Sequence, residues 1–235
     1  MSLQNFITER LKITSNSRSL KQTERTLFPK SKNELRSIIE QELEEQGPDA
    51  DLNHIDTSKI YDMSALFEDL DIRNIQIDEW DTHNVMTMRD MFASCDNFNC
   101  DLSRWDVSKV WNTNSMFYAC SSFNTDLSHW NVSKLEDMQA MFADCDNFNS
   151  DLSGWDVSKV TAMNETFHSC SKFESDLSGW DVSKVENMNN MFRECPNFES
   201  DLSGWDVSNV LTHSQMFKHC PKMESNPQLQ PKFKN

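Results

Sequence analysis

Carboxylates recur in this chain at intervals of 25 residues, and they are the side chains whose spacing is most able to support chemistry. One column of carboxylates comprises Asp56, Asp81, Asp106, Asn131, Asp156, Asp181 and Asp206, with Asn at one place. A second column comprises Asp101, Asp126, Asp151, Asp176 and Asp201. Stacked carboxylates can bind calcium through hard oxygen ligands, and a suitable pair can hydrolyse a glycosidic bond.

The sequence favours a structural role for these carboxylates. Lysines recur three residues after the first column, at Lys59, Lys109, Lys134, Lys159 and Lys184. Because these lysines offset the repulsion between stacked carboxylates, we expect a lattice of Asp–Lys and Asp–backbone contacts. Calcium bound between the turns is a second interpretation. A hydrolase is the least favoured, because a repeated array supplies no unique acid–base pair. We expect no metal and no cofactor.

Six cysteines share another position of the same interval: Cys95, Cys120, Cys145, Cys170, Cys195 and Cys220. A column of small apolar thiols is typical of a buried structural position. No Cys-x₂-Cys spacing and no paired histidines accompany the column, so a zinc site is not expected. The six histidines occupy scattered positions and suggest no nucleophile–base set, so we predict that the protein is not an enzyme.

A repeat of 25 residues positions all of these side chains. Its consensus reads DLSGWDVSKVxxMxxMFxxCxxFxS, and about seven units occupy residues 50–223. Tryptophan recurs at Trp80, Trp105, Trp130, Trp155, Trp180 and Trp205, and Ile55 takes that place in the first unit. One unit alone buries too little apolar surface to fold, so the units must stack. Stacking predicts that Trp155, Phe167, Cys145 and Cys170 are buried.

The spacing within a unit predicts a short strand followed by a helix. Residues 152–157 have leucine-rich-repeat spacing, with Trp155 and Val157 on one face of the strand. Residues 160–170 carry apolar side chains at helical spacing, and Ser158 is well placed to cap the helix. The predicted fold class is therefore α/β: a leucine-rich-repeat-type solenoid of parallel short strands, with one helix per 25-residue turn and an N-terminal helical cap.

Four segments follow along the chain. Residues 1–30 form an amphipathic segment and linker, which folds back on the array, docks to a partner or lies on a membrane surface. Residues 31–49 form the cap helix, because a Ser31–Glu34 capping box opens a helical stripe that Gly47 and Pro48 end. Residues 50–223 form the repeat array, and residues 224–235 form a frayed C-terminal tail.

The repeat resembles that of the BspA-like leucine-rich-repeat proteins of bacteria, mycoplasmas and some bacteriophages. The likeness rests on the core Asp-Leu-Ser-x-Trp-Asp-Val-Ser-x-Val and covers residues 50–223. The preceding FPKSKNELRSIIEQELEEQG also looks like the segment that leads into such arrays. The resemblance implies a solenoid fold and a surface or secreted adhesin role, and it brings no catalytic residues.

Charge and hydropathy narrow the class of partner. The formal net charge is −16, which disfavours nucleic acid and anionic membrane and suits a basic protein. No apolar run approaches the roughly 20 residues of a membrane span, and the N-terminus shows no secretory signal. Localisation stays open between the cell surface or exterior, which the resemblance implies, and the cytoplasm or a virion. The sequence sets no oligomeric state.

Partner specificity is expected where the copies differ. Trp111 is the one tryptophan outside the repeat column, at a variable position six residues after Trp105. We expect Trp111 to be partly exposed and to form a contact patch with Arg104, since large aromatics and arginines dominate binding energy. The remaining predicted contacts, for a basic partner, are Asp106, Asp156, Asp181 and Asp206.

These observations predict a non-catalytic, protein-binding repeat scaffold, of the kind found among bacterial surface or secreted adhesin-like proteins. The alternative is a structural, virion-associated protein encoded by a phage, which docks through its N-terminal segment.

Overall fold

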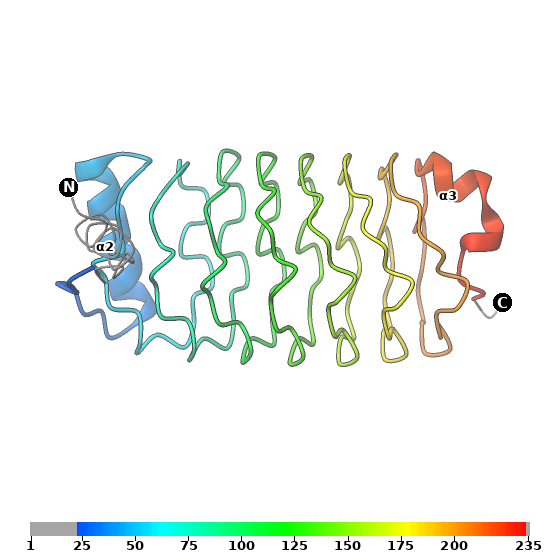
Figure 1. The fold of residues 1–235 in the computed structure, drawn as a ribbon, viewed down its shortest axis with the longest axis horizontal. Helices are drawn as coiled ribbons and strands as arrows, with labels where there is room; N and C mark the ends of the chain where they lie inside the picture. The colour runs from blue at the N-terminus through cyan, green and yellow to red at the C-terminus, as the bar shows by residue number, and fades with distance from the viewer. Residues whose placement is uncertain (1–22, 234–235) are drawn as a thin grey trace, which may run out of the picture.

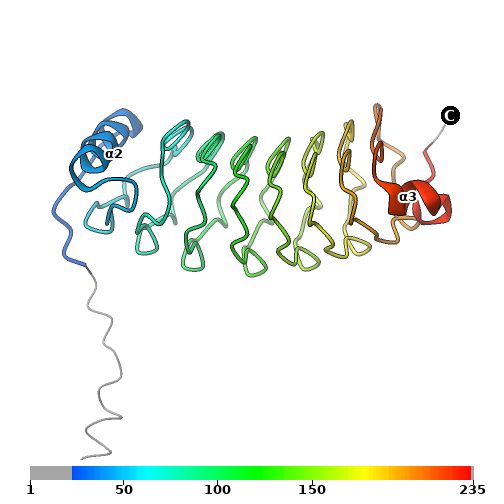
Figure 2. The same ribbon diagram turned by 90° about the horizontal axis from the view of Figure 1, so that it is seen from above.

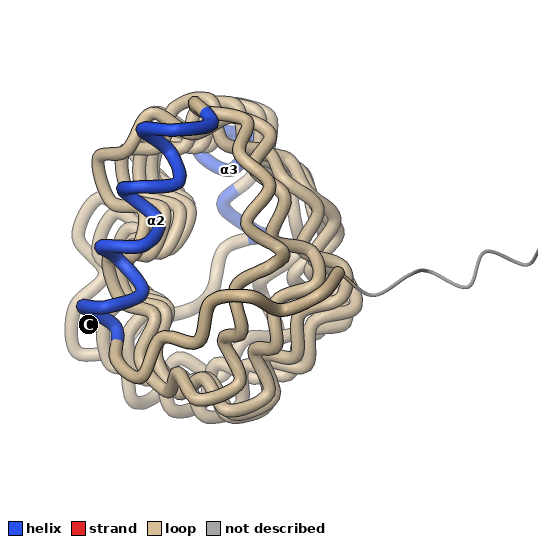
Figure 3. Tube along the Cα trace, turned by 90° about the vertical axis from the view of Figure 1, so that its left-hand side faces the viewer, coloured by secondary structure: helices blue, strands red, loops and turns tan. Residues whose placement is uncertain are grey.

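The computed structural model describes residues 23–233, which wind into a row of stacked coils with helices at both ends (Figure 1). Helix α2 (Lys32–Gln46) covers the N-terminal end of the row. Helix α3 (Pro221–Ser225) and the 3-10 helix η1 (Pro227–Leu229) cover the C-terminal end. From above, the coils follow one another along a single axis (Figure 2). Viewed along that axis they overlay as one ring, with α2 lying across it (Figure 3).

The predicted fold class, an α/β leucine-rich-repeat solenoid with parallel strands and one helix per turn, is wrong. Within residues 23–233, every helix lies at an end of the row. The coils between them are joined by isolated parallel bridges rather than by strands, as between Ala162 and Asn187. The predicted strand also contains a turn, in which the N–H of Trp155 donates to the carbonyl of Leu152 at 3.1 Å.

Left-handed residues explain why residues 160–170 do not form the predicted helix. Glu165 has a φ of 60° and Ser169 a φ of 56°. The same pair of positions is left-handed in the other coils: Ala65 and Asp69, Asp90 and Ser94, Ser115 and Ala119, Ala140 and Asp144, Asn190 and Glu194, Gln215 and His219. A left-handed residue costs about 1–2 kcal/mol and cannot continue a right-handed helix. The segment is therefore a series of turns, and Ser158 caps no helix.

Hydrogen bonds between coils replace those that a helix would make internally. The N–H of Phe167 donates to the carbonyl of Met191 in the next coil at 3.0 Å, whereas its helical acceptor would be Met163. The N–H groups of Glu165 and Ser169 also donate to the next coil, at 2.9 and 2.8 Å. All of these N–H groups point toward the C-terminal end of the row. The carbonyls that accept them point toward the N-terminal end.

Columns of aromatic rings fill the interior of the coils. The rings of Phe142 and Phe167, one coil apart, stack with centroids at 5.7 Å. Within one coil, Phe142 also stacks on Phe148 at 4.1 Å. The indole N–H of Trp155 donates to the carbonyl of Leu127 at 3.0 Å, so the buried ring leaves no polar atom without a partner.

The predicted burial of the repeat columns is confirmed. The fractional exposure of Phe167, Cys145 and Cys170 is 0%, and that of Trp155 is 4%. Val157 is buried as well. Turns therefore bury the same positions that a strand and a helix would have buried.

Helix α2 lies within residues 31–49, the segment expected to form the cap helix. The hydroxyl of Ser31 accepts a hydrogen bond from the N–H of Glu34, as the capping box requires. Gly47 follows with a φ of 82°, a conformation that favours glycine. Leu35 and Ile39 are fully buried and belong to the apolar core.

The C-terminal residues pack against the last coil, so the prediction of a frayed tail is wrong as far as Phe233. The carbonyl of Leu229 accepts a hydrogen bond from the N–H of Leu202 at 2.7 Å. The ring of Phe233 stacks on His213, with centroids at 3.7 Å. Residues 1–22, which include the predicted amphipathic segment, lie outside the described residues, as do residues 234 and 235.

Candidate functional site

The carboxylate columns shape the backbone of their own repeats. Asp156 accepts a hydrogen bond from the N–H of Ser158 at 3.1 Å, and Asp151 accepts one from Ser153 at 2.9 Å. Hydrogen bonds from the hydroxyl and the N–H of Ser158 lower the pKa of Asp156. The other predicted carboxylates, Asp106, Asp181 and Asp206, make the same turn with the serine two residues later. The Asp–backbone half of the expected lattice is therefore present.

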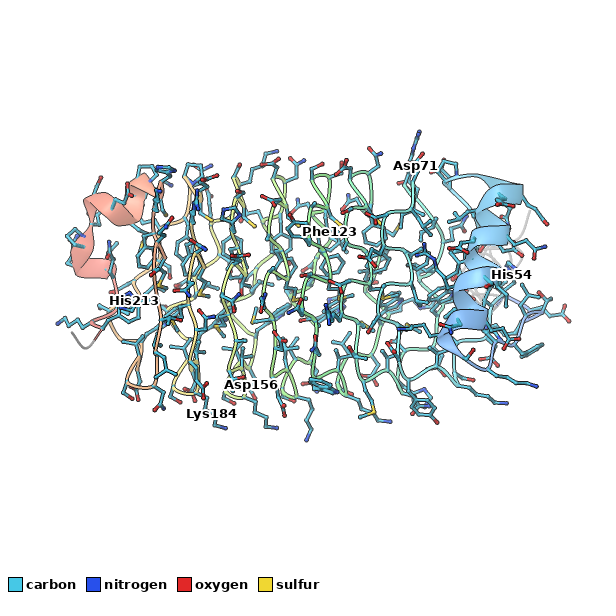
Figure 4. The ribbon with its side chains drawn as sticks, turned by 180° about the vertical axis from the view of Figure 1, so that it is seen from behind. His54, Asp71, Phe123, Asp156, Lys184 and His213 are labelled. Carbon is cyan, nitrogen blue, oxygen red and sulfur yellow. The ribbon has the colours of Figure 1, made fainter. Side chains whose placement is uncertain are left out.

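The Asp–Lys half of that lattice is absent as direct ion pairs. Within residues 23–233, one lysine has a carboxylate within 4 Å. It is Lys32, which lies outside the lysine column and pairs with Asp62 at 3.1 Å. Lys159 acts on Asp156 from further away, and its charge adds to the lowering of that pKa. Asp156 and Lys184 lie along the same long edge of the row, whereas Phe123 lies inside (Figure 4).

The thiols of the cysteine column are hydrogen-bonded to backbone carbonyls. The Sγ of Cys145 donates to the carbonyl of Phe117 at 2.9 Å, and burial raises the pKa of Cys145 well above its usual range. Cys100, outside the column, is also buried and donates to the carbonyl of Arg73 at 3.3 Å. Across the described part of the chain, no three His, Cys, Asp or Glu side chains gather where they could hold a metal ion.

The structure does not bring Arg104 to Trp111. The guanidinium of Arg104 contacts the carboxylate of Asp78 at 3.5 Å and that of Glu79 at 3.8 Å. It does not line the groove beside Trp111. The predicted patch of these two residues is therefore not formed, although Trp111 itself is exposed as expected.

Trp111 belongs to a row of exposed apolar side chains from three successive coils, here called the apolar ridge: Tyr61, Met86 and Trp111. Their fractional exposures are 59%, 48% and 41%. The N–H of Met86 donates to the carbonyl of Tyr61 at 2.8 Å, and the N–H of Trp111 donates to that of Met86 at 3.0 Å. Backbone hydrogen bonds thus hold the three side chains side by side.

A groove of about 450 Å³ runs along the apolar ridge. Its remaining walls come from Asn84, Lys109, Lys134 and Glu136. Lys109 and Trp111 both face outward, because Val110 between them is buried. The groove therefore combines a mostly apolar wall with two amines and one carboxylate.

Sequence reasoning found one residue of this groove and missed its neighbours. Met86 occupies the same repeat position as Trp111, and Tyr61 occupies it in the divergent first unit. Counting six residues from Ile55, which holds the tryptophan place in that unit, leads to Tyr61. The repeat register alone would therefore have revealed three large apolar side chains in a row.

Stacked, nearly identical coils of 25 residues define the chain as a tandem-repeat protein. The family model described as "Mycoplasma protein of unknown function, DUF285" matches it twice, over residues 39–155 and 125–230, and the chain belongs to this family. No curated protein matches the chain, and no solved structure does either. In residues 23–233, the helices are too short or too polar to cross a membrane.

Proposed function

We propose that this protein is a non-catalytic repeat scaffold that binds a protein partner across the groove at the apolar ridge. One observation carries the proposal. Tyr61, Met86 and Trp111 are large apolar side chains, and they are exposed next to one another on three rigidly joined coils. A contiguous exposed apolar patch with a polar rim is typical of a protein–protein contact. Tyrosine, tryptophan and methionine are enriched at such contacts.

The interactions of the carboxylates and thiols support a non-catalytic role. The carboxylates accept hydrogen bonds from their own turns, and the thiols are buried with raised pKa values. Because the repeat resembles that of BspA-like proteins, we propose that the scaffold is an adhesin-like surface or secreted protein. The phage-encoded structural alternative depends on residues 1–22, so the described residues do not favour it.

Affinity capture with the full chain tests the proposal, using the organism's own surface and secreted proteins as prey. The double variant Met86→Ala, Trp111→Ala should weaken capture of a specific partner at least about tenfold, because such residues are typical hot spots. Leu211→Ala is the matched control. Leu211 occupies the same repeat position in the last coil and is 77% exposed, but it lies outside the groove.

A partner that binds the parent and the double variant equally well would refute the groove as the contact site. Loss of binding in Leu211→Ala as well would point to a general effect on the fold. Melting temperatures of both variants separate that effect from a local one, since exposed side chains contribute little to stability.

A further inference from the structure

In the groove, an otherwise acidic molecule exposes amines beside apolar side chains. The lysine row, which comprises Lys59, Lys109, Lys134, Lys159 and Lys184, stands two positions before the column of the apolar ridge. In the coils of Lys159 and Lys184, an aspartate three residues earlier lowers the local positive charge. In the coil of Lys134, that position holds Asn131 instead of aspartate. Lys134 therefore lacks the aspartate three residues earlier that the other lysines of the row have.

Both amines of the groove are available to a ligand. Within the described chain, neither Lys109 nor Lys134 has a carboxylate within 4 Å. Lys109 donates one hydrogen bond to the amide oxygen of Asn84 at 3.1 Å, which leaves two of its N–H groups free for others. An ammonium beside an apolar wall attracts a carboxylate more strongly than one surrounded by water, because the local dielectric is lower.

The groove presents amines as its main free polar groups. Its one amide, that of Asn84, accepts from Lys109 and donates to the carbonyl of Ser58 at 3.0 Å. The groups left over are the two amines, the carboxylate of Glu136 and the apolar ridge. An acidic peptide with apolar side chains would use both the amines and the apolar surface.

We propose that the groove binds an acidic segment of its protein partner in extended conformation. The apolar side chains of the segment lie on Tyr61, Met86 and Trp111, and its carboxylates contact the amines of Lys109 and Lys134. This inference rests on the proposed function and names the chemistry of the partner. It replaces the basic partner that the acidic columns suggested, because those carboxylates lie outside the groove.

The test uses the full chain and fluorescent octapeptides as probes. A peptide of alternating glutamate and leucine should bind. One with serine in place of leucine should bind at least about tenfold more weakly, and one with lysine in place of glutamate should not bind. Raising the salt from about 0.05 to about 0.5 M should weaken the binding of the first peptide, because exposed charges are screened.

Four single substitutions then probe the charges of the groove. Lys134→Gln should weaken binding of the glutamate–leucine peptide by about three- to tenfold, and Asn131→Asp should weaken it as well. Glu136→Gln should tighten it. Lys184→Gln, in the same row but outside this groove, is the control and should leave it unchanged. Asn131→Asp only restores the residue of the other repeats, so it should fold normally.

The inference is overturned if the glutamate–leucine peptide fails to bind at about 1 mM. It is equally overturned if the lysine peptide or an oligouronate binds more tightly, or if Lys134→Gln, Asn131→Asp and Glu136→Gln have no effect. Partner capture that is lost in Met86→Ala, Trp111→Ala but is insensitive to these charges would leave the proposed function standing and remove this inference alone. Capture that is insensitive to the double variant would remove both.

Discussion

The column cysteines are single residues whose ionisation is coupled to folding. Burial raises the pKa of Cys95 to about 12, against about 8.5 for an unfolded thiol. A group whose pKa is higher in the folded state contributes stability below the unfolded pKa and loses it as the pH rises. The stabilising contribution of Cys95 is therefore complete below about pH 8.5 and is lost between about pH 8.5 and 12.

We predict that the free energy of unfolding falls steeply above pH 8.5. Each buried thiol adds a slope of about 1.4 kcal/mol per pH unit, because the unfolded chain ionises while the folded chain does not. Urea unfolding between about pH 7.5 and about pH 10 measures the slope. The Cys95→Ala variant should show a slope that is lower by the contribution of one thiol, about 1.4 kcal/mol per pH unit.

Reactivity of the same thiols gives an independent check. At about pH 8, a thiol reagent should label the native protein only as fast as the coils open, because the thiolate is the reactive form. Rapid labelling of the native column, or equal slopes in Cys95→Ala and the parent, would show that the thiols are not buried.

At the scale of the element, one substitution distinguishes turns from the helix that the spacing predicted. Ala119 has a φ of 57°. In a helix, replacing an alanine by glycine destabilises by about 1 kcal/mol. At a left-handed position the replacement removes a strain of about 1–2 kcal/mol, against a smaller loss of about 0.4–1 kcal/mol through the entropy of the unfolded chain.

We therefore predict that Ala119→Gly leaves the stability unchanged or raises it by up to about 1 kcal/mol. Ala119→Val should destabilise, because a β-branched side chain is poorly tolerated at positive φ. Thermal or urea unfolding measures both variants. A clear loss of stability in Ala119→Gly would argue for a helix at this position.

The columns could be predicted from the sequence, but the local conformation between them could not. Apolar residues at Val160, Met163, Phe167 and Cys170 point inward in a helix, and they also point inward in successive turns. The deciding difference is where the N–H of Phe167 goes, and its acceptor Met191 lies in another repeat. Several left-handed positions hold Ala, Glu or Gln, which are not typical of that conformation. The residue types therefore did not indicate the left-handed turns.

One feature of the candidate site could also be predicted from the sequence, and another could not. The exposure of Trp111 could be predicted because this tryptophan lies outside the buried column. The pairing of Arg104 with Asp78 could not, because the partner lies in the preceding coil and depends on how the coils stack. Variation between copies thus indicated where to look, and stacking determined which side chains meet.

At the scale of the whole molecule, the two ends need different caps. In the turns that contain the left-handed residues, the inter-coil N–H groups point toward the C-terminal end. In these turns, the first coil therefore presents carbonyls with no preceding coil to donate to them, and the last coil presents N–H groups with no following coil to accept from them. At the first end, the guanidinium of Arg36 donates to the carbonyls of Ala65 at 3.1 Å and Leu66 at 2.8 Å. At the last end, the carboxylate of Glu224 accepts from the N–H of His219 at 3.0 Å. A cation covers one end and an anion contacts the other.

We predict that Arg36→Ala destabilises the first coils by about 2 kcal/mol, because hydrogen bonds from a charged donor contribute about 1.5–3 kcal/mol. Hydrogen exchange should quicken in residues 55–75 and remain unchanged in residues 150–175, since each coil contacts only its neighbours. Arg36 also pairs with Glu40 at 2.6 Å on the surface.

Glu40→Ala is the control, because it removes that exposed ion pair alone and should have an effect below about 0.5 kcal/mol. If exchange in the central coils quickens as much as in the first, the caps protect the whole row as one cooperative unit. In that case the local role assigned to Arg36 is incorrect.

Identical neighbours have a consequence for how such a protein can change over time. The block Asp-Leu-Ser-Gly-Trp-Asp-Val-Ser begins at residues 151, 176 and 201, so unequal recombination within the gene can duplicate or delete one 25-residue unit in register. Each duplication would lengthen the row by one coil, about 4.8 Å, and leave α2, the groove and the C-terminal cap as they are. The separation between the groove and the far end can therefore evolve in fixed steps, independently of what the groove binds.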